Sequence, residues 1–441
     1  MTDATGAETP GPPPPGQPRR VAIACQGGGS HTAFTAGVLG RLFSDDVLSR
    51  YRVVGLSGTS GGAICALIAW SALTGGEPRS AGRMLDAFWK SNSASSPAES
   101  LMNSWMIWAS QLANFLAAPA VSPYDNPAAE FALDHLRGLL SKSVDFSSFG
   151  AIADDPEAPK LLLGAVDVMS GEFKAFDSRH GEITPEAVLA SAAIPTLFRS
   201  IHAAGGVYWD GLFSQNPPVR ELLDTEPDEI WVIQINAQRT AVEPRTMVEI
   251  ADRRNELSGN LSLYQELHFI ERIDSLIEDG HLVGGGYKPI TIRIIEMSRS
   301  TQSQRLGEAS KINRDPAFLS ELITQGRQRG AIFVDAMSFE RAWRSGDQEA
   351  VESYFADEAQ ISSAPPFTAR TAGQDPESVR EFVTDALSNS VSVDLTRKQM
   401  SGDRVRWRVR VPAAENGGFR VGAAEARFVD GKIATFTLGP L

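Results

Sequence analysis

A serine set between glycines is the first pattern in this sequence that could carry out covalent chemistry. Residues 58–62 read Gly-Thr-Ser-Gly-Gly, which fits G-x-S-x-G, and they stand between a strand-like segment and the helix-like segment 63–72. In that context a tight turn exposes the serine hydroxyl, and the helix N-terminus favours a developing negative charge. The pattern predicts Ser60 as a nucleophile, with a structural glycine turn as the alternative.

A run of three glycines, Gly27, Gly28 and Gly29, directly follows the first apolar segment of the chain. Consecutive glycines expose backbone N–H groups at a helix start, and such groups bind anions. A P-loop is excluded because no lysine stands at the required place, and a dinucleotide fingerprint would need glycine in place of Thr32. The run therefore predicts an oxyanion hole that serves the downstream serine.

The third pattern is Asp210-Gly211, which follows a short apolar segment. Asp-Gly is a common turn and is weak by itself. A serine nucleophile needs a base, commonly a histidine, and His268 and His281 lie downstream of Asp210. His268 falls within an amphipathic helical pattern over residues 261–277, where a surface or packing role is expected. These residues alone leave the base open between the aspartate and a histidine.

The elements that must position these residues alternate between strand and helix. Apolar runs typical of buried strands occupy residues 21–25, 51–56, 161–168, 230–235 and 290–295. Helical patterns between them predict a mostly parallel sheet covered on both faces, the α/β class. Residues 1–18 are rich in proline and glycine and are predicted to form a disordered leader.

An uncharged stretch from Leu101 to Pro119 contains Trp105 and Trp108. Polar residues interrupt it, which is unfavourable for a membrane span of ~20 residues. A cap or core helix is one interpretation. An interfacial or acyl-binding flap over the active site is the other.

Composition limits the classes of partner. The 441 residues carry a formal net charge of -13, which argues against broad nucleic-acid binding and gives no general attraction to anionic membranes. The two cysteines, Cys25 and Cys65, are expected in the core, and no histidines stand at metal-ligand spacing, so no cofactor is expected. No secretory signal is visible, which favours a cytoplasmic location.

The sequence pattern changes near residue 338. Residues 339–356 are predicted as two short helices and 376–387 as a third, followed by strand patterns at 391–395, 405–411, 419–427 and 433–438. Helices followed by a run of antiparallel strands indicate an α+β domain. The sequence thus predicts one domain over 19–337 and a second over 338–441.

The three chemical motifs in this order resemble the signature of the patatin-like phospholipases. Residues 190–195, Ala-Ser-Ala-Ala-Ile-Pro, and the pair Asn216-Pro217 also resemble segments of that family, and the resemblance runs from about residue 21 to 335. It implies a three-layer α/β/α hydrolase domain with a Ser-Asp dyad. Ser60 would attack the ester carbonyl of a lipid or other acyl ester, and Asp210 would act as the base.

The resemblance also implies that the oxyanion is held by backbone N–H groups of Gly27, Gly28, Gly29 and Gly61. Three positions depart from the family pattern. Many members have aspartate before the glycine run and arginine two residues after it, where this chain has Gln26 and His31. The common Asp-Gly-Gly also becomes Asp-Gly-Leu, with Leu212 in the third place. The dyad is retained, so activity is expected while substrate preference stays open.

Residues 338–441 resemble the nuclear-transport-factor-like, or SnoaL-like, α+β cone fold, in helices that carry Trp343 and Tyr354 and in the curved strands that follow. Such cones imply a homodimer through the sheet or a ligand-holding module. Acyl transfer by the same dyad and a non-catalytic lipid-binding scaffold are the alternative functions. A transient contact with a membrane surface is a further hypothesis.

Overall fold

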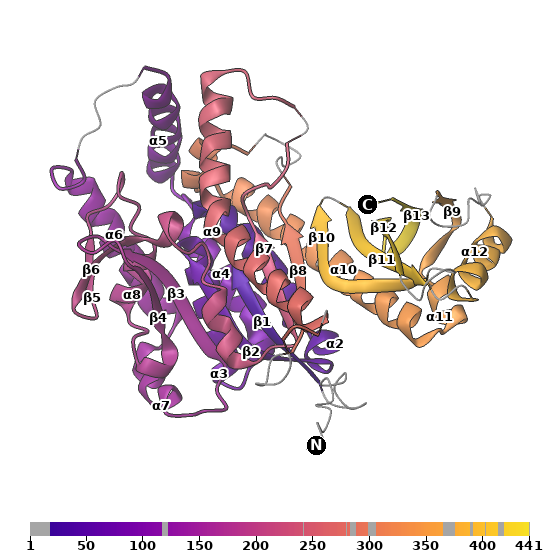
Figure 1. The fold of residues 1–441 in the computed structure, drawn as a ribbon. Coiled ribbons are helices and arrows are strands. Elements are labelled where there is room, and N and C mark those ends of the chain that lie inside the picture. The colour runs from indigo at the N-terminus through magenta and orange to yellow at the C-terminus, as the bar shows by residue number, and fades with distance from the viewer. Residues whose placement is uncertain are drawn as a thin grey trace. The chain divides into compact units, whose positions relative to one another are not determined.

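The computed structural model of this chain describes residues 18–116, 122–240, 242–278, 280–282, 288–298, 306–364, 375–388, 391–401, 403–412 and 419–440. It divides into two compact units, Met1–Ile290 with Met297–Arg327, and Thr291–Glu296 with Gln328–Leu441 (Figure 1). The leader expected over 1–18 lies outside the described residues except for Pro18. Apart from the short segment Thr291–Glu296, the second unit begins at Gln328, whereas the sequence predicts a domain boundary near 337.

The first unit is built on a mixed sheet with the strand order β5-β6-β3-β2-β1-β7, with β4 also paired to β3. Its strands are β1 (Arg19–Cys25), β2 (Tyr51–Thr59), β3 (Lys160–Asp167), β4 (Phe173–Asp177), β5 (Ile201–Ala203), β6 (Gly206–Asp210) and β7 (Glu229–Gln234). The central pairs β3–β2, β2–β1 and β1–β7 are parallel, whereas β4 and β6 run antiparallel to β3. The predicted α/β sheet, parallel at its centre, is confirmed.

Helices flank this sheet on both faces (Figure 1). They are α1 (Ala33–Leu42), α2 (Asp45–Leu48), α3 (Gly61–Thr74), α4 (Ala81–Asn92), α5 (Pro97–Leu116), α6 (Pro127–Ser143), α7 (Phe149–Ala153), α8 (Pro185–Ser191) and α9 (Met247–Glu278), with the short turns η1 (Gly29–Thr32), η5 (Gly211–Phe213) and η7 (Glu308–Ile312). Cover on both faces explains why residues 21–25 form an unbroken apolar run and are fully buried. Cys25 and Cys65 are buried in this core, as predicted.

The second unit contains an antiparallel sheet that carries a parallel strand at each end, with the order β8-β10-β11-β12-β13-β9. The strands are β8 (Thr291–Glu296), β9 (Phe355–Ser363), β10 (Ser392–Ser401), β11 (Arg404–Pro412), β12 (Phe419–Val429) and β13 (Lys432–Gly439), with helices α11 (Gln348–Glu352) and α12 (Pro376–Ser388) and the C-terminal part of α10 (Pro316–Ser345). β8 pairs with β10 and groups with this unit. Residues 339–356 contain two helical segments separated at Gly346 and Asp347, as predicted, but the first is the end of the long α10, the second is α11, and β9 already begins at Phe355.

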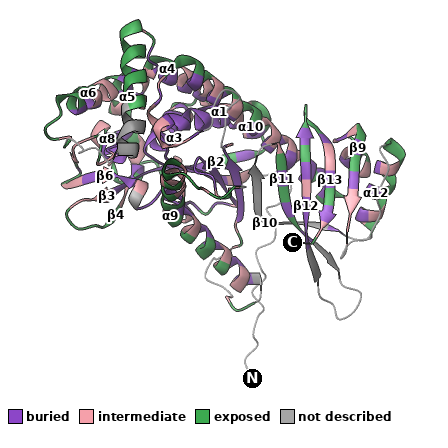
Figure 2. Ribbon diagram, turned by 90° about the horizontal axis from the view of Figure 1, so that it is seen from above, coloured by how far each residue is buried: buried purple, intermediate pink, exposed green. Residues whose placement is uncertain are grey.

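The core of the second unit is aromatic. One face of β13 is buried through Ile433, Phe436 and Leu438, whereas Thr437 is exposed, and the alternation along the strand is visible in Figure 2. The ring of Phe436 lies 5.9 Å from that of Phe339 on α10, measured between centroids. Further rings in this cluster come from Trp343, Phe355, Phe382 and Trp407. The space between sheet and helices is thus filled by packed rings.

Candidate active site

Strand register brings the two candidate catalytic residues together. β3 lies between β2 and β6 in the sheet. Across β2 and β3, Thr59 pairs with Gly164, and across β6 and β3, Asp210 pairs with Ala165. Ser60 directly follows Thr59, so the nucleophile and the aspartate stand on either side of the same short segment of β3. Two motifs 150 residues apart, Ser60 and Asp210, therefore meet in one site.

Ser60 occupies a strained turn between β2 and α3. Its φ of 58° and ψ of -130° lie outside the regions that non-glycine residues favour, so the surroundings must hold it there. Its N–H donates to both the carbonyl and the hydroxyl oxygen of Ser191, each at 3.1 Å. The Ser191 hydroxyl in turn donates to the Gly164 carbonyl at 2.7 Å. The end of α8 thereby fixes the nucleophile turn to β3.

Asp210 is buried at the end of β6, with 1% of its surface exposed. Its N–H donates to the Ala193 carbonyl at 2.9 Å, and its Oδ1 accepts the N–H of Leu212 at 2.8 Å. Its Oδ2 is buried and accepts no hydrogen bond of ordinary geometry from the described residues. The Ser60 hydroxyl nevertheless lies close enough to act on the pKa of this carboxyl. Loose catalytic hydrogen bonds of this kind are common before substrate binds.

Burial raises the pKa of Asp210 to about 7. Interactions with the Ser60 hydroxyl, the Leu212 N–H and the charge of Lys311 each lower it, but burial outweighs them. An ordinary aspartate is a weak base at neutral pH. A carboxyl that titrates near 7 has the basicity that general base catalysis at neutral pH requires.

The histidine alternatives are not in this site. His268 has 83% of its side chain exposed on α9 and faces Glu271, and His281 is exposed in a turn. His31 lies close to the glycine run in the sequence, but its Nε2 lies 2.8 Å from the Ser310 hydroxyl. Within the described part of the chain, the hydrogen bonds of Ser60 and Asp210 involve no histidine.

The glycine run packs directly against the nucleophile turn. A Cβ on Gly27 would lie 3.1 Å from the Ser60 Cβ and 2.7 Å from the Thr59 carbonyl, so only glycine fits there. The Gly27 N–H donates to Asn216 Oδ1 at 2.7 Å and is therefore already engaged. Outside the helices and strands of the described chain, no backbone hydrogen bond uses the N–H of Gly28, Gly29 or Gly61.

Gln26 and His31, two of the departures from the family pattern, are both buried and both neutral. Gln26 accepts the N–H groups of Ile235 and Asn236 through Oε1, and its Nε2 donates to the Gly259 carbonyl and to Asn260. A carboxylate could not make the last two bonds, because it has no donor. The amide therefore fits this position by linking the end of β1 to α9.

Metal and membrane-spanning features are not found in the described residues. No cluster of three or more histidine, cysteine, aspartate or glutamate side chains there could hold a metal ion. None of the helices in the same residues is long and apolar enough to cross a bilayer.

Comparison with known families identifies two domains in this chain. The family model for patatin-like phospholipase matches residues 23–223, and the model for the SnoaL-like domain matches residues 336–436. The chain joins a patatin-like domain to a SnoaL-like domain. The patatin-like domain contains Ser60, the glycine run and Asp210, and the match supports lipid acyl hydrolase activity in general. No curated protein matches the sequence.

Solved structures with similarity to this chain include two NTF2-like proteins of unknown function. The one from Cytophaga hutchinsonii is 12% identical, covers 24% of this chain and 87% of its own, and has a TM-score of 0.20. The one from Mesorhizobium loti is 21% identical, covers 25% and 89%, and has a TM-score of 0.22. At these scores the two likenesses carry no functional argument.

Proposed function

We propose that this protein is a serine hydrolase that cleaves carboxylic esters of lipids, with Ser60 as nucleophile and Asp210 as general base. The observation that carries the proposal is the buried Asp210 carboxyl, which lies beside the Ser60 hydroxyl and whose Oδ2 is without a hydrogen-bond partner in the described residues. A scaffold would gain nothing from keeping such a group unsatisfied, because an unpaired buried polar atom costs free energy.

In the acylation half-reaction, Ser60 Oγ attacks the ester carbonyl carbon while its proton passes to Asp210. The negative charge that develops on the carbonyl oxygen is stabilised by the backbone N–H groups of Gly28, Gly29 and Gly61, which have no backbone acceptor outside the helices and strands of the described residues, and by the N-terminus of α3. The C–O bond to the alcohol then breaks, and the alcohol leaves with the proton from Asp210. The product is an acyl-enzyme.

In the deacylation half-reaction, Asp210 takes a proton from a water molecule, which attacks the acyl-enzyme carbonyl. Collapse of the second tetrahedral intermediate returns the proton to Ser60 and releases the fatty acid. An alcohol in place of water would give acyl transfer by the same steps. The Gly27 N–H is engaged by Asn216, so we assign it to loop positioning rather than to the oxyanion.

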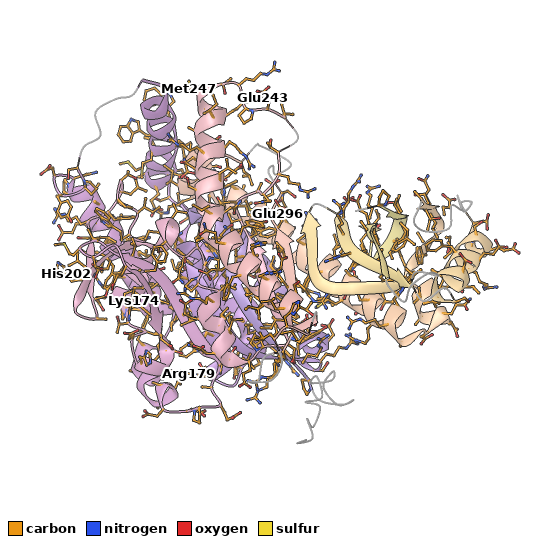
Figure 3. The ribbon with its side chains drawn as sticks, in the orientation of Figure 1. Lys174, Arg179, His202, Glu243, Met247 and Glu296 are labelled. Carbon is orange, nitrogen blue, oxygen red and sulfur yellow. The ribbon has the colours of Figure 1, made fainter. Side chains whose placement is uncertain are left out.

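Two helices that bond loops of the site, α5 and α9, support a lipid surface as the source of substrate. α5 exposes Trp105 and Trp108, with 59% and 56% of their surfaces accessible, so this part of the stretch is not a core helix. α9 contacts α5 and exposes Met247 and Leu261. Both helices project from the same side of the unit (Figure 1), and Figure 3 shows Met247 at the far end of α9.

Both helices are also tied to the loops of the site. On α5, Asn103 bonds the side chain of Asn313 and the N–H of Arg314, directly after η7. On α9, residues 259–260 bond Gln26, directly before the glycine run. Tryptophan is favoured at the boundary between lipid and water, so these exposed faces suit a transient contact with aggregated lipid.

The decisive experiment combines covalent labelling with turnover. Purified wild type, Ser60→Ala and Asp210→Asn are treated with a fluorophosphonate probe and assayed on short-chain esters and mixed phospholipid vesicles. We expect labelling at Ser60, release of fatty acid by wild type, and a loss of at least about 10³-fold in kcat for each folded variant. Labelling with acyl transfer to added alcohols, and no free fatty acid, would identify a transferase. A folded wild type that neither labels nor turns over would favour the lipid-binding scaffold.

The lipid-surface hypothesis has its own test. We expect Trp105→Glu/Trp108→Glu to lower activity on vesicles about tenfold, because charge at the interface opposes docking, and to leave hydrolysis of soluble esters unchanged. Phe173→Glu is the matched control, since Phe173 is equally exposed but lies on β4. Equal losses in both variants, or none in either, would reject a role for α5 in lipid contact.

A further inference from the structure

The site carries a cation that no sequence motif marks. Position 31, where related sequences often have arginine, holds a histidine that cannot replace its charge. Burial, and then the charge of Lys311, lower the pKa of His31 to about 3, so the ring is neutral at physiological pH. The Ser310 hydroxyl donates to the Gly307 carbonyl, so its oxygen accepts the His31 Nε2–H. His31 thus joins η1 to η7 without contributing charge.

Lys311, the next residue on η7, is held against the glycine run. Its backbone carbonyl packs so closely on Gly29 that a Cβ there would collide with it. Its Nζ lies 3.2 Å from Asn236 Oδ1 and 2.8 Å from Glu308 Oε2, and only 14% of its side chain is exposed. The N–H of Asn236 in turn donates to Gln26, which precedes the glycine run. The ammonium is therefore fixed beside the proposed oxyanion loop.

We propose that Lys311 is the positioning cation of this active site, supplying from η7 the fixed positive charge that His31 cannot provide. The inference deepens the proposed function and rests on it. A fixed ammonium favours the ionised form of Asp210 before reaction, and it stabilises the negative charge that forms on the substrate oxygen. The residue acts through Asp210 and the oxyanion loop, so it is not itself assigned contact with the reacting atoms.

The other charged side chains that line the cavity around Lys311 are acidic and reduce the positive potential that the ammonium creates. A small cavity next to the glycine run is lined by His31, Lys311, Asp252, Glu256 and Glu308, with Asn236. Glu256 pairs with Arg253 at 2.9 Å, and Asp252 accepts the N–H of Glu308. Glu308 is the carboxylate bound to the ammonium, so it offsets part of the charge. Removal of Lys311 and removal of Glu308 should therefore shift the pKa of Asp210 in opposite directions.

The test is the pH dependence of kcat/KM on a soluble ester, for wild type, Lys311→Met, Lys311→Arg and Glu308→Gln. Lys311 lowers the pKa of Asp210, so its loss must raise that pKa and move the acidic limb of the profile to higher pH. We expect about a tenfold lower kcat/KM for Lys311→Met at pH 6, the size that one pKa unit represents. Lys311→Arg should return the acidic limb of the profile to its wild-type position, and Glu308→Gln should move this limb to lower pH.

The matched control is Lys288→Met, since Lys288 also pairs with one carboxylate, Asp228, at 2.6 Å, but is not in this cavity. A purely structural role for Lys311 would lower the folded fraction and leave the limb in place. An unshifted limb in folded Lys311→Met, or an equal shift in Lys288→Met, would overturn the proposal.

A second measurement separates this proposal from the proposed function. The carboxyl of Asp210 is titrated by carbon NMR in Asp-labelled wild type and Lys311→Met, with Asp210→Asn to assign its signal. An upward shift of this titration in Lys311→Met supports the electrostatic role even in protein that shows no turnover. Lack of labelling and turnover in wild type rejects the hydrolase, whereas an unchanged titration rejects the role of Lys311.

Discussion

Two buried carboxylates, Glu340 in the second unit and Asp210 in the first, have opposite hydrogen-bonding environments. In the second unit, Glu340 accepts two hydrogen bonds from Arg293, at 3.0 and 2.9 Å, and one from Trp407 Nε1 at 2.7 Å. In the first unit, Asp210 accepts one backbone N–H and leaves Oδ2 without a partner in the described residues, beside a serine with a strained backbone.

This difference separates structural from chemical use of the same functional group. A buried carboxylate that is fully paired keeps its charge and holds its surroundings in place. One that is only partly satisfied has a raised pKa and can exchange a proton near neutral pH. A buried carboxylate oxygen without a partner in the described residues and a strained serine backbone occur together at Asp210 and Ser60, which directs attention to the first unit for catalysis.

The largest effect on stability is expected from removing the charge of the paired carboxylate, Glu340. Glu340→Gln should destabilise the second unit by about 3–5 kcal/mol, because the buried Arg293 loses its counter-charge. Calorimetry of thermal unfolding measures the change. Arg293→Met/Glu340→Leu is the control, since removal of both charges should recover most of the loss. Ester hydrolysis by the folded variant should be unchanged, and a large fall in its kcat would contradict the assignment of catalysis to the first unit.

Neutralising Asp210, the partly satisfied carboxylate, should change the free energy of unfolding in the opposite direction. The folded-state pKa of Asp210 is raised to about 7, so ionisation of this residue lowers stability as pH rises from its unfolded pKa toward 7. Asp210→Asn should therefore raise the free energy of unfolding by about 2–4 kcal/mol at pH 8 and by about half as much at pH 5.

Denaturant titration at the two pH values checks this prediction. Asp145→Asn is the control, because hydrogen bonds from Ser147 lower the pKa of that exposed carboxyl and its loss should not stabilise the protein. If Asp210→Asn were equally or less stable than wild type at pH 8, the buried carboxyl would not carry the expected cost of ionisation.

A smaller effect is expected from the support of the glycine run. Asn216→Ala removes the acceptor of the Gly27 N–H and should lower kcat/KM about tenfold, the worth of roughly one hydrogen bond in a positioning role. Asn216→Asp keeps an acceptor at the same place and should retain more activity. Steady-state kinetics on a soluble ester checks both variants, and equal kinetics for wild type and Asn216→Ala would show that the loop needs no such support.

Local sequence patterns predicted much of the first unit and part of its site. Continuous apolar runs predicted the buried strands β1, β2, β3 and β7, because a sheet covered on both faces requires apolar residues on both sides of each strand. The glycine-flanked Ser60 predicted its own strand-to-helix turn, since few residue types tolerate that geometry. These features follow from neighbours in the chain, so the sequence alone determined them.

Only the tertiary structure decided what surrounds these residues. Ser191 and Ala193 bond the N–H groups of Ser60 and Asp210 across more than one element, and no local pattern encodes such pairing. The charge of Lys311 reaches the site from a turn 101 residues beyond Asp210. The proton affinity of Asp210 depends on how completely other segments bury it. Burial and electrostatic potential are sums over residues distant in sequence, which is why they emerge only when the chain is folded.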